Sequence, residues 1–290
     1  MSFLITGATG FVGKKVVEIA LGQGNQVAVL TRSISTAEQF FPNKNVKIYD
    51  LTKFLSGEEK IDIKKYDKLI HLGWADVKNY MDENNSLENL EFQKHLLNNL
   101  INSGVRDITV SGSCLEYGMN EGACDEDIAA KQPITSYADA KIKLYEYLKE
   151  KQKSSSELKI KWMRFFYVYG IGSRPNSLLS QLLKAIENGD SEFNMSPGDQ
   201  QRDFISLDCL TKNVIAIAGQ NEVDGIINIG NGKPVAVSDF VVGILKLRNS
   251  KIKLNKGFYP YAKYEPHSFW ADITKLKSIK NTVFDKNFNI

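Results

Sequence analysis

Three glycines that follow the first apolar segment constrain the fold of this chain more than any other feature. Residues 2–6 read as a buried strand, and Gly7, Gly10 and Gly13 come directly after it, where a helical pattern opens. At this spacing the first glycine permits a tight turn, the second lets backbone approach a pyrophosphate, and the third lets helix and strand pack closely. The N-terminus of that helix then faces the anion. The pattern predicts dinucleotide binding, and its alternative is a glycine-rich turn without a ligand. The candidate cofactor residues of this loop are Gly7, Gly10, Phe11, Val12 and Gly13.

Short apolar runs alternate with longer helical patterns along the chain, which is typical of βαβ units and a parallel sheet. The candidate strands are 2–6, 26–31, 46–49, 68–72, 107–111, 159–166 and 225–229, and the candidate helices are 13–21, 87–103, 136–151, 178–187 and 238–247. This order predicts an α/β fold, a doubly wound parallel sheet of the Rossmann type with a smaller C-terminal α/β lobe for substrate. We expect the dinucleotide-binding domain over 1–169, with returns to the sheet near 205–230. The lobe then comprises 170–204 and 231–290.

Charge and composition exclude several other classes. The chain has 37 Lys and Arg against 34 Asp and Glu, for a net charge of +3, with the two signs interspersed. A nucleic-acid binder needs a concentrated basic face, so we expect no nucleic-acid partner. No run approaches 18 apolar residues, and the N-terminus lacks the features of a signal peptide, so we expect no membrane span. Three scattered cysteines and three histidines at no ligand spacing predict a reduced, cytoplasmic protein without a metal.

The end of the second predicted strand bears on which dinucleotide is bound. An acidic residue about 20 positions after the glycines would bind the ribose 2′-hydroxyl of NAD. No Asp or Glu lies between Glu18 and Glu38, and the strand ends in Thr31, Arg32 and Ser33. Arg32 can pair with a 2′-phosphate, so the sequence predicts NADP(H) over NAD(H). The alternative is a solvent-facing arginine at a strand end.

The catalytic pair has to be chosen among several Tyr-x-x-x-Lys matches. The pattern occurs at Tyr49, Tyr137, Tyr145, Tyr147 and Tyr259. Only Tyr137 and Lys141 combine a helix start with a preceding strand that ends in serines, of which Ser113 lies 24 residues before Tyr137. The four-residue spacing puts Tyr137 and Lys141 on one helical face. The alternative is a tyrosine and a lysine on a helix surface.

The predicted chemistry is reduction of a ketone by hydride, with Tyr137 as the proton donor. A tyrosine with a pKa near 10 is a poor match for neutral pH. A lysine ammonium about 5 Å away, at an effective dielectric constant near 20, favours tyrosinate by roughly 3 kcal/mol. We therefore expect Lys141 to lower the pKa of Tyr137, and Ser113 to hydrogen-bond the substrate oxygen.

With these motifs in place, the chain resembles the extended short-chain dehydrogenase/reductase family, in its nucleotide-sugar epimerase/dehydratase group, over nearly its whole length. By this resemblance Asp50 and Leu51 contact the adenine, Leu72 lies beside the cofactor, and Lys141 also holds the nicotinamide ribose. Arg202 resembles the family arginine that meets the diphosphate of a nucleotide sugar. Tyr167 stands where the family has an asparagine at the substrate lobe. The resemblance implies three catalytic residues, Ser113, Tyr137 and Lys141, and three substrate residues, Ser113, Tyr167 and Arg202.

Departures from the family pattern bear on the reaction. Family 4,6-dehydratases carry an Asp-Glu pair directly after the catalytic Ser or Thr, and here those positions are Cys114 and Leu115, which disfavours a dehydratase. Glu116 comes one position later and is expected to make a structural or substrate-hydroxyl contact. The leading hypothesis is an NADPH-dependent reductase of a nucleotide-linked 4-keto-6-deoxyhexose. A nucleotide-sugar 4-epimerase with tightly bound NAD and a cofactor-sensing regulator without turnover remain as alternatives. The family also implies a homodimer through the helices at 87–103 and 136–151.

Overall fold

A seven-stranded parallel sheet forms the centre of the computed structural model, which describes residues 1–42, 45–75, 80–132 and 134–287. Its strand order is β3-β2-β1-β4-β5-β7-β12, so the predicted doubly wound sheet is confirmed. From β1 the chain adds β2 and β3 on one side and then β4, β5, β7 and β12 on the other, so the strand order reverses between β1 and β4. In such sheets ligands bind at the carboxyl ends of the strands at this switch point. The strands are β1 (Ser2–Thr6), β2 (Gln26–Thr31), β3 (Val46–Asp50), β4 (Lys68–His71), β5 (Asp107–Ser113), β7 (Lys159–Phe165) and β12 (Gly225–Ile229).

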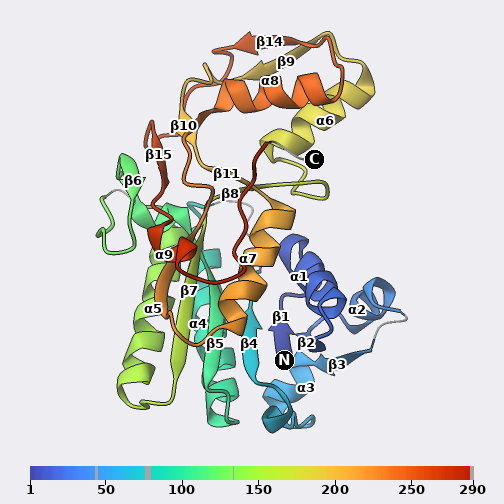
Figure 1. Ribbon diagram of the computed structural model, residues 1–290, viewed down its shortest axis with the longest axis vertical. Coiled ribbons are helices and arrows are strands. Elements are labelled where there is room, and N and C mark those ends of the chain that lie inside the picture. The colour runs from blue at the N-terminus through green and yellow to red at the C-terminus, as the bar shows by residue number, and fades with distance from the viewer. Residues whose placement is uncertain (43–44, 76–79, 133, 288–290) are drawn as a thin grey trace.

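Helices cover both faces of this sheet, which explains why its strands read as continuous apolar runs. On β1, Phe3 and Ile5 face one hydrophobic cluster and Leu4 faces another. The first cluster contains residues of α1, α2, α7 and α9, and the second contains residues of α3, α4 and α5. Figure 1 shows α4 and α5 side by side along the sheet. The bounds are α1 (Phe11–Gly22), α2 (Ile34–Phe40), α3 (Leu51–Ser56), α4 (Glu83–Asn102), α5 (Ser136–Lys153), α7 (Leu207–Gly219) and α9 (Thr274–Lys277), with short 3-10 turns η1 (Ile63–Lys65) and η2 (Cys114–Tyr117).

A smaller lobe lies beyond the carboxyl ends of the strands, at the top of Figure 1. Its two main helices, α6 (Leu178–Asn188) and α8 (Val237–Leu247), pack with the parallel pair β9 (Glu192–Met195) and β14 (Lys253–Lys256) around a third hydrophobic cluster. Short strand pairs join the lobe to the sheet. They are β8 (Tyr167–Tyr169) with β11 (Phe204–Ser206), β10 (Gln201–Arg202) with β13 (Val235–Ala236), and β6 (Gly122–Cys124) with β15 (Phe269–Ala271).

The largest element absent from the sequence prediction is α7, which occupies half of the stretch 205–230, where only returns to the sheet were expected. Its sequence gives no clean helical stripe, because eight of its residues are buried on several sides. A helix enclosed on most sides does not show the amphipathic pattern on which the prediction relied. Another difference is that β11 pairs with β8 outside the main sheet, so only β12 returns to it.

Candidate active site

The glycine loop has the shape that was predicted from its spacing. Gly7 adopts a φ of +71°, and a Cβ at this position would lie 2.6 Å from the backbone nitrogen of Gly73, at the end of β4. A Cβ on Gly13 would lie 2.1 Å from the carbonyl oxygen of Gly7. Both positions therefore exclude any side chain, and the N-terminus of α1 comes close to the β1 turn. A dinucleotide pyrophosphate fits this cradle, because no side chain projects from these two glycines.

A cavity of about 670 Å³ opens over the glycine loop. It is lined by all three loop glycines and by Phe11, Val12 and Leu72, as expected for cofactor residues. Its far wall carries Tyr137, Lys141 and Trp74. Eight of the eleven predicted cofactor residues, Tyr137 and Lys141 among them, thus line one space.

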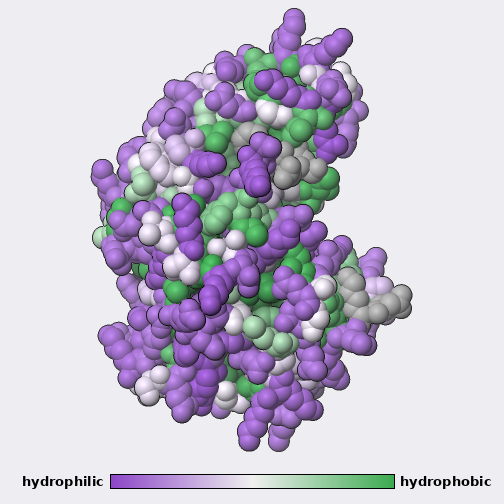
Figure 2. Space-filling model, viewed as in Figure 1, coloured by the Kyte–Doolittle hydropathy of each residue, from purple (hydrophilic) through white to green (hydrophobic). Residues whose placement is uncertain are grey.

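A second cavity of about 610 Å³ lies between the sheet and the lobe, and Figure 2 shows the outline of the molecule notched between these two parts. Both cavities are lined by Tyr137, Gly112, Phe165 and Arg174, so they meet at the predicted catalytic tyrosine. The second cavity also contains the predicted substrate residues, Ser113, Tyr167 and Arg202. A cofactor in the first cavity and a substrate in the second would face each other across Tyr137. The two spaces are called the cofactor cavity and the substrate cavity below.

Tyr137 and Lys141 come from the first turns of α5, and Ser113 ends β5. Thr135 caps α5 by accepting a hydrogen bond from the Ala138 N–H at 3.1 Å. The Lys141 ammonium is buried, donates to the Ser111 carbonyl at 2.8 Å, and lies 4.1 Å from the centre of the Trp74 ring. These contacts hold the Lys141 side chain in the wall of the cavity over the glycine loop.

The expected lowering of the Tyr137 pKa is wrong for the polypeptide itself. Burial raises the pKa of Tyr137 above its usual value near 10, and the charges of Tyr80 and Glu116 raise it further. Burial also lowers the pKa of Lys141 to about 7, against the opposing effect of Glu116. A lysine that is partly neutral near pH 7 offers less positive charge to its tyrosine than the sequence argument assumed.

Glu116 makes the structural contact that was expected of it. Its carboxylate is 1% exposed and accepts hydrogen bonds from the Ser113 N–H at 2.7 Å, the Trp162 Nε1 at 2.9 Å and the Arg164 Nε at 2.9 Å. Both carboxylate oxygens are occupied by these hydrogen bonds, and Glu116 does not line the second cavity. The carboxylate is therefore not placed to act as an acid or base on a substrate. Cys114 and Leu115 line the substrate cavity in its place.

Arg202 lines the substrate cavity but is already engaged within the chain. Its guanidinium is buried, donates to Glu265 at 2.9 Å and to the carbonyls of Gln201 and His267, and lies 5.4 Å from the centre of the Tyr167 ring. Burial and the Glu265 carboxylate raise the pKa of Tyr167 well above its usual value. A diphosphate meeting Arg202 would therefore have to share it with Glu265.

The residues predicted to read the adenine end lie at the carboxyl ends of β2 and β3. Arg32 is exposed, with its guanidinium 5.7 Å from the centre of the Phe92 ring of α4. The Asp50 carboxylate caps α3 by accepting from the N–H groups of Thr52 and Lys53, and Leu51 is buried beneath it. None of the three lines the cavity over the glycine loop, so their part in binding stays a prediction.

Several aromatic and charged residues of the site were not predicted. Tyr80 contacts the Tyr137 ring at 5.4 Å and the Tyr264 ring at 6.3 Å, and Trp74 meets Tyr137 edge-on at 5.6 Å. Arg174 lies at the junction of the two cavities and lowers the pKa of Tyr137. These residues come from loops far apart in the sequence. The only feature of the sequence that could have pointed to them is that each follows closely after a recognised motif.

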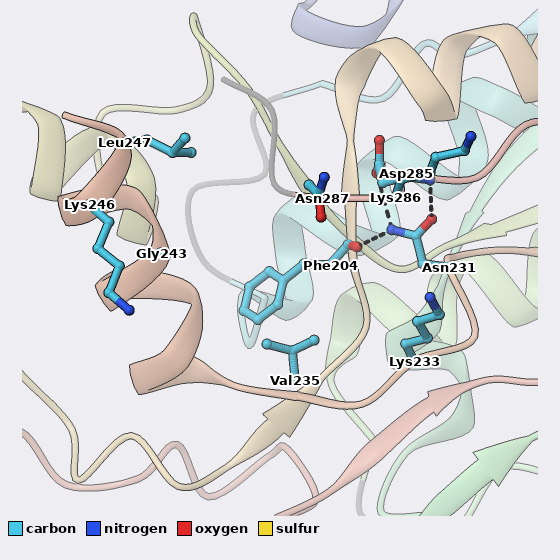
Figure 3. A pocket seen from close by; sticks show the side chains of 10 residues that line it. All are labelled: Phe204, Asn231, Lys233, Val235, Gly243, Lys246, Leu247, Asp285, Lys286 and Asn287. Atoms are coloured by element: carbon cyan, nitrogen blue, oxygen red, sulfur yellow. Dashed lines mark hydrogen bonds between the residues drawn. The ribbon is translucent and has the colours of Figure 1, made fainter.

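A third cavity of about 470 Å³ lies behind the substrate cavity and does not contain the catalytic residues. Figure 3 shows Phe204 among the side chains that line it, together with Lys233, Lys246 and Lys286. The Phe204 ring stacks on Phe240 at 4.1 Å, and both rings also line the substrate cavity. Phe204 thus borders both spaces.

Two further searches cover the part of the chain that the structure describes. Within residues 1–42, 45–75, 80–132 and 134–287, no cluster of three or more His, Cys, Asp or Glu side chains could hold a metal ion. Over the same ranges, none of the helices has the length and apolar character needed to cross a bilayer.

Comparisons with known proteins point in one direction. A model of the NAD dependent epimerase/dehydratase family matches residues 3–230. The chain is 27% identical to a dTDP-6-deoxy-L-talose 4-dehydrogenase (NAD(+)) of Aggregatibacter actinomycetemcomitans, over 93% of this chain and 99% of that protein. It is 26% identical to a UDP-glucuronate 4-epimerase of Thermodesulfobacterium geofontis, over 96% and 90% of the two chains. Among solved structures, MoeE5 in complex with UDP-glucose and NAD matches with a TM-score of 0.82 at 21% identity, over 99% and 95% of the two chains.

Proposed function

Because the chain belongs to the NAD-dependent epimerase/dehydratase family, we propose that it transfers hydride between a nicotinamide cofactor and C4 of a nucleotide-linked sugar. The finer proposal is reduction of a nucleotide-linked 4-keto-6-deoxyhexose. The 4-dehydrogenase of A. actinomycetemcomitans is named for the same position of a dTDP-linked 6-deoxysugar, which supports both statements. Reduction of a 4-ketone is the reverse of a 4-dehydrogenation.

The observation that carries the proposal is the meeting of the two cavities at Tyr137. The bound cofactor would supply or accept the hydride. The Tyr137 hydroxyl donates a proton to the substrate oxygen as negative charge develops there. Ser113 orients the same oxygen from the end of β5. The protonated Lys141 side chain places a positive charge 5.8 Å from the centre of the Tyr137 ring.

The cavity lining also supports a redox reaction over elimination of water. Loss of water from the sugar needs an acid and a base beside the ring. At the two positions after Ser113 the cavity presents the Cys114 thiol, whose pKa burial raises, and the apolar Leu115. Neither can take the proton.

For the cofactor we propose NADP(H), with Arg32 at the 2′-phosphate and Asp50 and Leu51 at the adenine. The exposed Arg32 guanidinium lies at the end of β2, where a ribose 2′-substituent would reach it. The relative that is named for NAD(+) favours NAD(H) instead. Replacing Arg32 with Ala should reduce NADPH affinity about tenfold and leave NADH affinity unchanged, because one charge-assisted contact is lost. Fluorescence titration with both cofactors measures this, and an unchanged ratio would contradict the assignment.

The test of the reaction begins with the purified protein. Denaturation and chromatography identify any released nucleotide, and the emptied protein is then assayed with NADPH or NADH and dTDP-linked 4-keto-6-deoxyhexoses. Oxidation of the cofactor with formation of the 4-hydroxy sugar is the expected result. Stoichiometric NAD⁺ retained through purification would favour the 4-epimerase, the second candidate, which the T. geofontis relative represents. Absence of turnover across the sugar panel would favour a cofactor-sensing regulator.

We also propose a homodimer through α4 and α5. These helices pack against each other on one face of the sheet, and Leu87 on α4 is 56% exposed. Two copies of a 32.6 kDa chain would give a mass near 65 kDa. Light scattering measures it, and a mass near 33 kDa at micromolar concentration would contradict the proposal.

A further inference from the structure

Glu116 lies directly behind the catalytic residues, although it contacts neither cavity. It is the third residue of the turn η2, and it forms a reciprocal capping box with Ser113. The Ser113 hydroxyl accepts from the Leu115 N–H at 3.2 Å, while the Glu116 Oε1 accepts from the Ser113 N–H at 2.7 Å. The carboxylate thereby fixes the backbone of the residue that is expected to orient the substrate oxygen.

The other carboxylate oxygen is held from β7. Its Oε2 accepts from both Trp162 Nε1 and Arg164 Nε at 2.9 Å. Arg164 makes an ion pair with Glu116 in which the two side chains are 8% and 1% exposed. Removing this carboxylate would leave the buried Arg164 guanidinium without its ion-pair partner.

The backbone of β5 is built around this carboxylate. A Cβ on Gly112 would lie 2.7 Å from the Glu116 Oε1 and 2.3 Å from the Trp162 Nε1. Gly112 also lines both the cofactor and the substrate cavity. Gly112, a residue without a side chain, therefore lies between the Glu116 carboxylate and the two cavities.

We propose that Glu116 is a positioning residue of the reaction, whose carboxylate holds the backbone of Ser113 in place at the end of β5. The inference rests on the proposed function. It goes beyond it by assigning a role to a carboxylate that takes no proton from substrate and touches no substrate atom. It also separates two effects of one side chain, a hydrogen bond and a charge, that can be measured independently.

The charge argument requires every ionisable group around the pair to be counted. Lys141 extends from α5 toward β5 and β7, and the described ionisable groups near the pair are Glu116 with its ion-pair partner Arg164, His71, Tyr80, Cys114 and Arg174. Burial lowers the pKa of His71 to about 3, so it is neutral, and burial raises the pKa of the Cys114 thiol. Arg174 is positive and borders Tyr137. Glu116 is thus the carboxylate that opposes the effect of burial on Lys141.

The closing experiment is the pH profile of kcat for ketone reduction in Glu116→Gln. Without the negative charge the pKa of Lys141 falls, and the pKa of Tyr137 falls as well, because Glu116 raises both. Reduction needs the protonated forms of both groups, so the alkaline limb should move to lower pH by about one unit. A folded Glu116→Gln protein with its alkaline limb at the wild-type pH would refute an effect of the Glu116 charge on Lys141, and the positioning role is then decided by the kcat of the variant that shortens the side chain.

Two variants separate the charge from the hydrogen bond and from stability. Glu116→Asp keeps the charge but shortens the reach to the Ser113 N–H, so we expect a lower kcat with the alkaline limb at the wild-type pH. This variant also decides the matter if Glu116→Gln does not fold, because an unchanged kcat in Glu116→Asp would contradict the positioning role. Asp107→Asn is the matched control. It removes another buried, ion-paired carboxylate, at the opposite end of β5, and should lower stability without moving the limb.

The outcome remains informative if the proposed reaction is wrong. Wild-type protein without turnover refutes the reductase proposal and says nothing of Glu116. The titration of Lys141 can then be followed directly by NMR of ¹³C-labelled lysine, with Lys141→Arg to assign the signal. A lower pKa of Lys141 in Glu116→Gln than in wild type supports the charge role, and equal values refute it.

Discussion

At the scale of single residues, the site assigns the proton transfer to the Tyr137 hydroxyl. Tyr137→Phe should lower kcat by about 10²–10⁴-fold with little change in cofactor affinity, because a positioned general acid contributes that much and the ring contacts remain. Steady-state kinetics and NAD(P)H titration test this. The control is Tyr147→Phe, which removes the hydroxyl of another Tyr-x-x-x-Lys match on the same helix, one that bonds Asn98 at 3.4 Å. Near-native turnover of Tyr137→Phe would rule out the assignment.

The pKa of Lys141 shows where sequence reasoning stops at this scale. The position of Tyr137 and Lys141 on one helical face follows from helix geometry and could be predicted from their four-residue separation in the sequence. The lysine's pKa, lowered to about 7, depends on Trp74 above it and on the sheet beneath it, which no local pattern contains. The expectation of a lowered Tyr137 pKa was wrong for the same reason: burial was not part of the argument.

At the scale of elements, the contact between β1 and α1 depends on Gly13. Gly13→Ala places a Cβ about 1 Å inside the normal contact distance of the Gly7 carbonyl, so α1 must move away from the strand. We expect a loss of about 1–3 kcal/mol in the free energy of unfolding and weaker cofactor binding. Urea denaturation and NAD(P)H titration measure the two effects. Gly22→Ala, in the last turn of α1, is the control and should be neutral or slightly stabilising, because nothing lies within 4 Å of its Cβ.

The elements that could be predicted are those whose pattern is local. Gly13 is required by a contact with Gly7 within a single strand–turn–helix unit. β1 and β2 contain continuous apolar runs because both faces of the sheet are covered. α7 was missed because it is buried on several sides. The substrate cavity was missed in detail because Tyr80, Arg174 and Tyr264 meet only through the packing of three separate loops. Sequence patterns thus predicted the cofactor half of the site better than the substrate half.

At the scale of the whole molecule, one buried carboxylate ties the lobe to the sheet. Asp203, which lies between β10 and β11, accepts the N–H groups of Asn231 at 2.7 Å, Gly232 at 2.8 Å and Ala271 at 3.1 Å. These three bonds hold the segment after β12 and the strand β15 around the point where the chain passes from lobe to sheet. Burial nevertheless raises the pKa of Asp203 to about 6, which exceeds the effect of the three donors.

A carboxyl whose pKa is higher in the folded than in the unfolded chain stabilises the fold when it is protonated. That contribution is complete below an unfolded pKa near 3.9 and is lost as the pH rises through about 6. The free energy of unfolding of wild type, minus that of Asp203→Asn, should therefore fall by up to about 3 kcal/mol between pH 4 and pH 7.5. Urea denaturation at four pH values measures this difference. The pH-dependent contributions of the ionisable groups that both proteins share cancel in it.

The sign of the effect is checked by a second carboxyl only four residues away. Asp199 is exposed, and the hydrogen bond from the Tyr261 hydroxyl lowers its pKa, so its contribution to stability is present at neutral pH and is lost as the pH falls. Asp199→Asn should therefore change the pH dependence in the opposite direction, and weakly, because solvent screens the pair. Parallel pH profiles for wild type and Asp203→Asn would show that the three backbone donors offset burial completely, and that the connection between lobe and sheet is insensitive to pH.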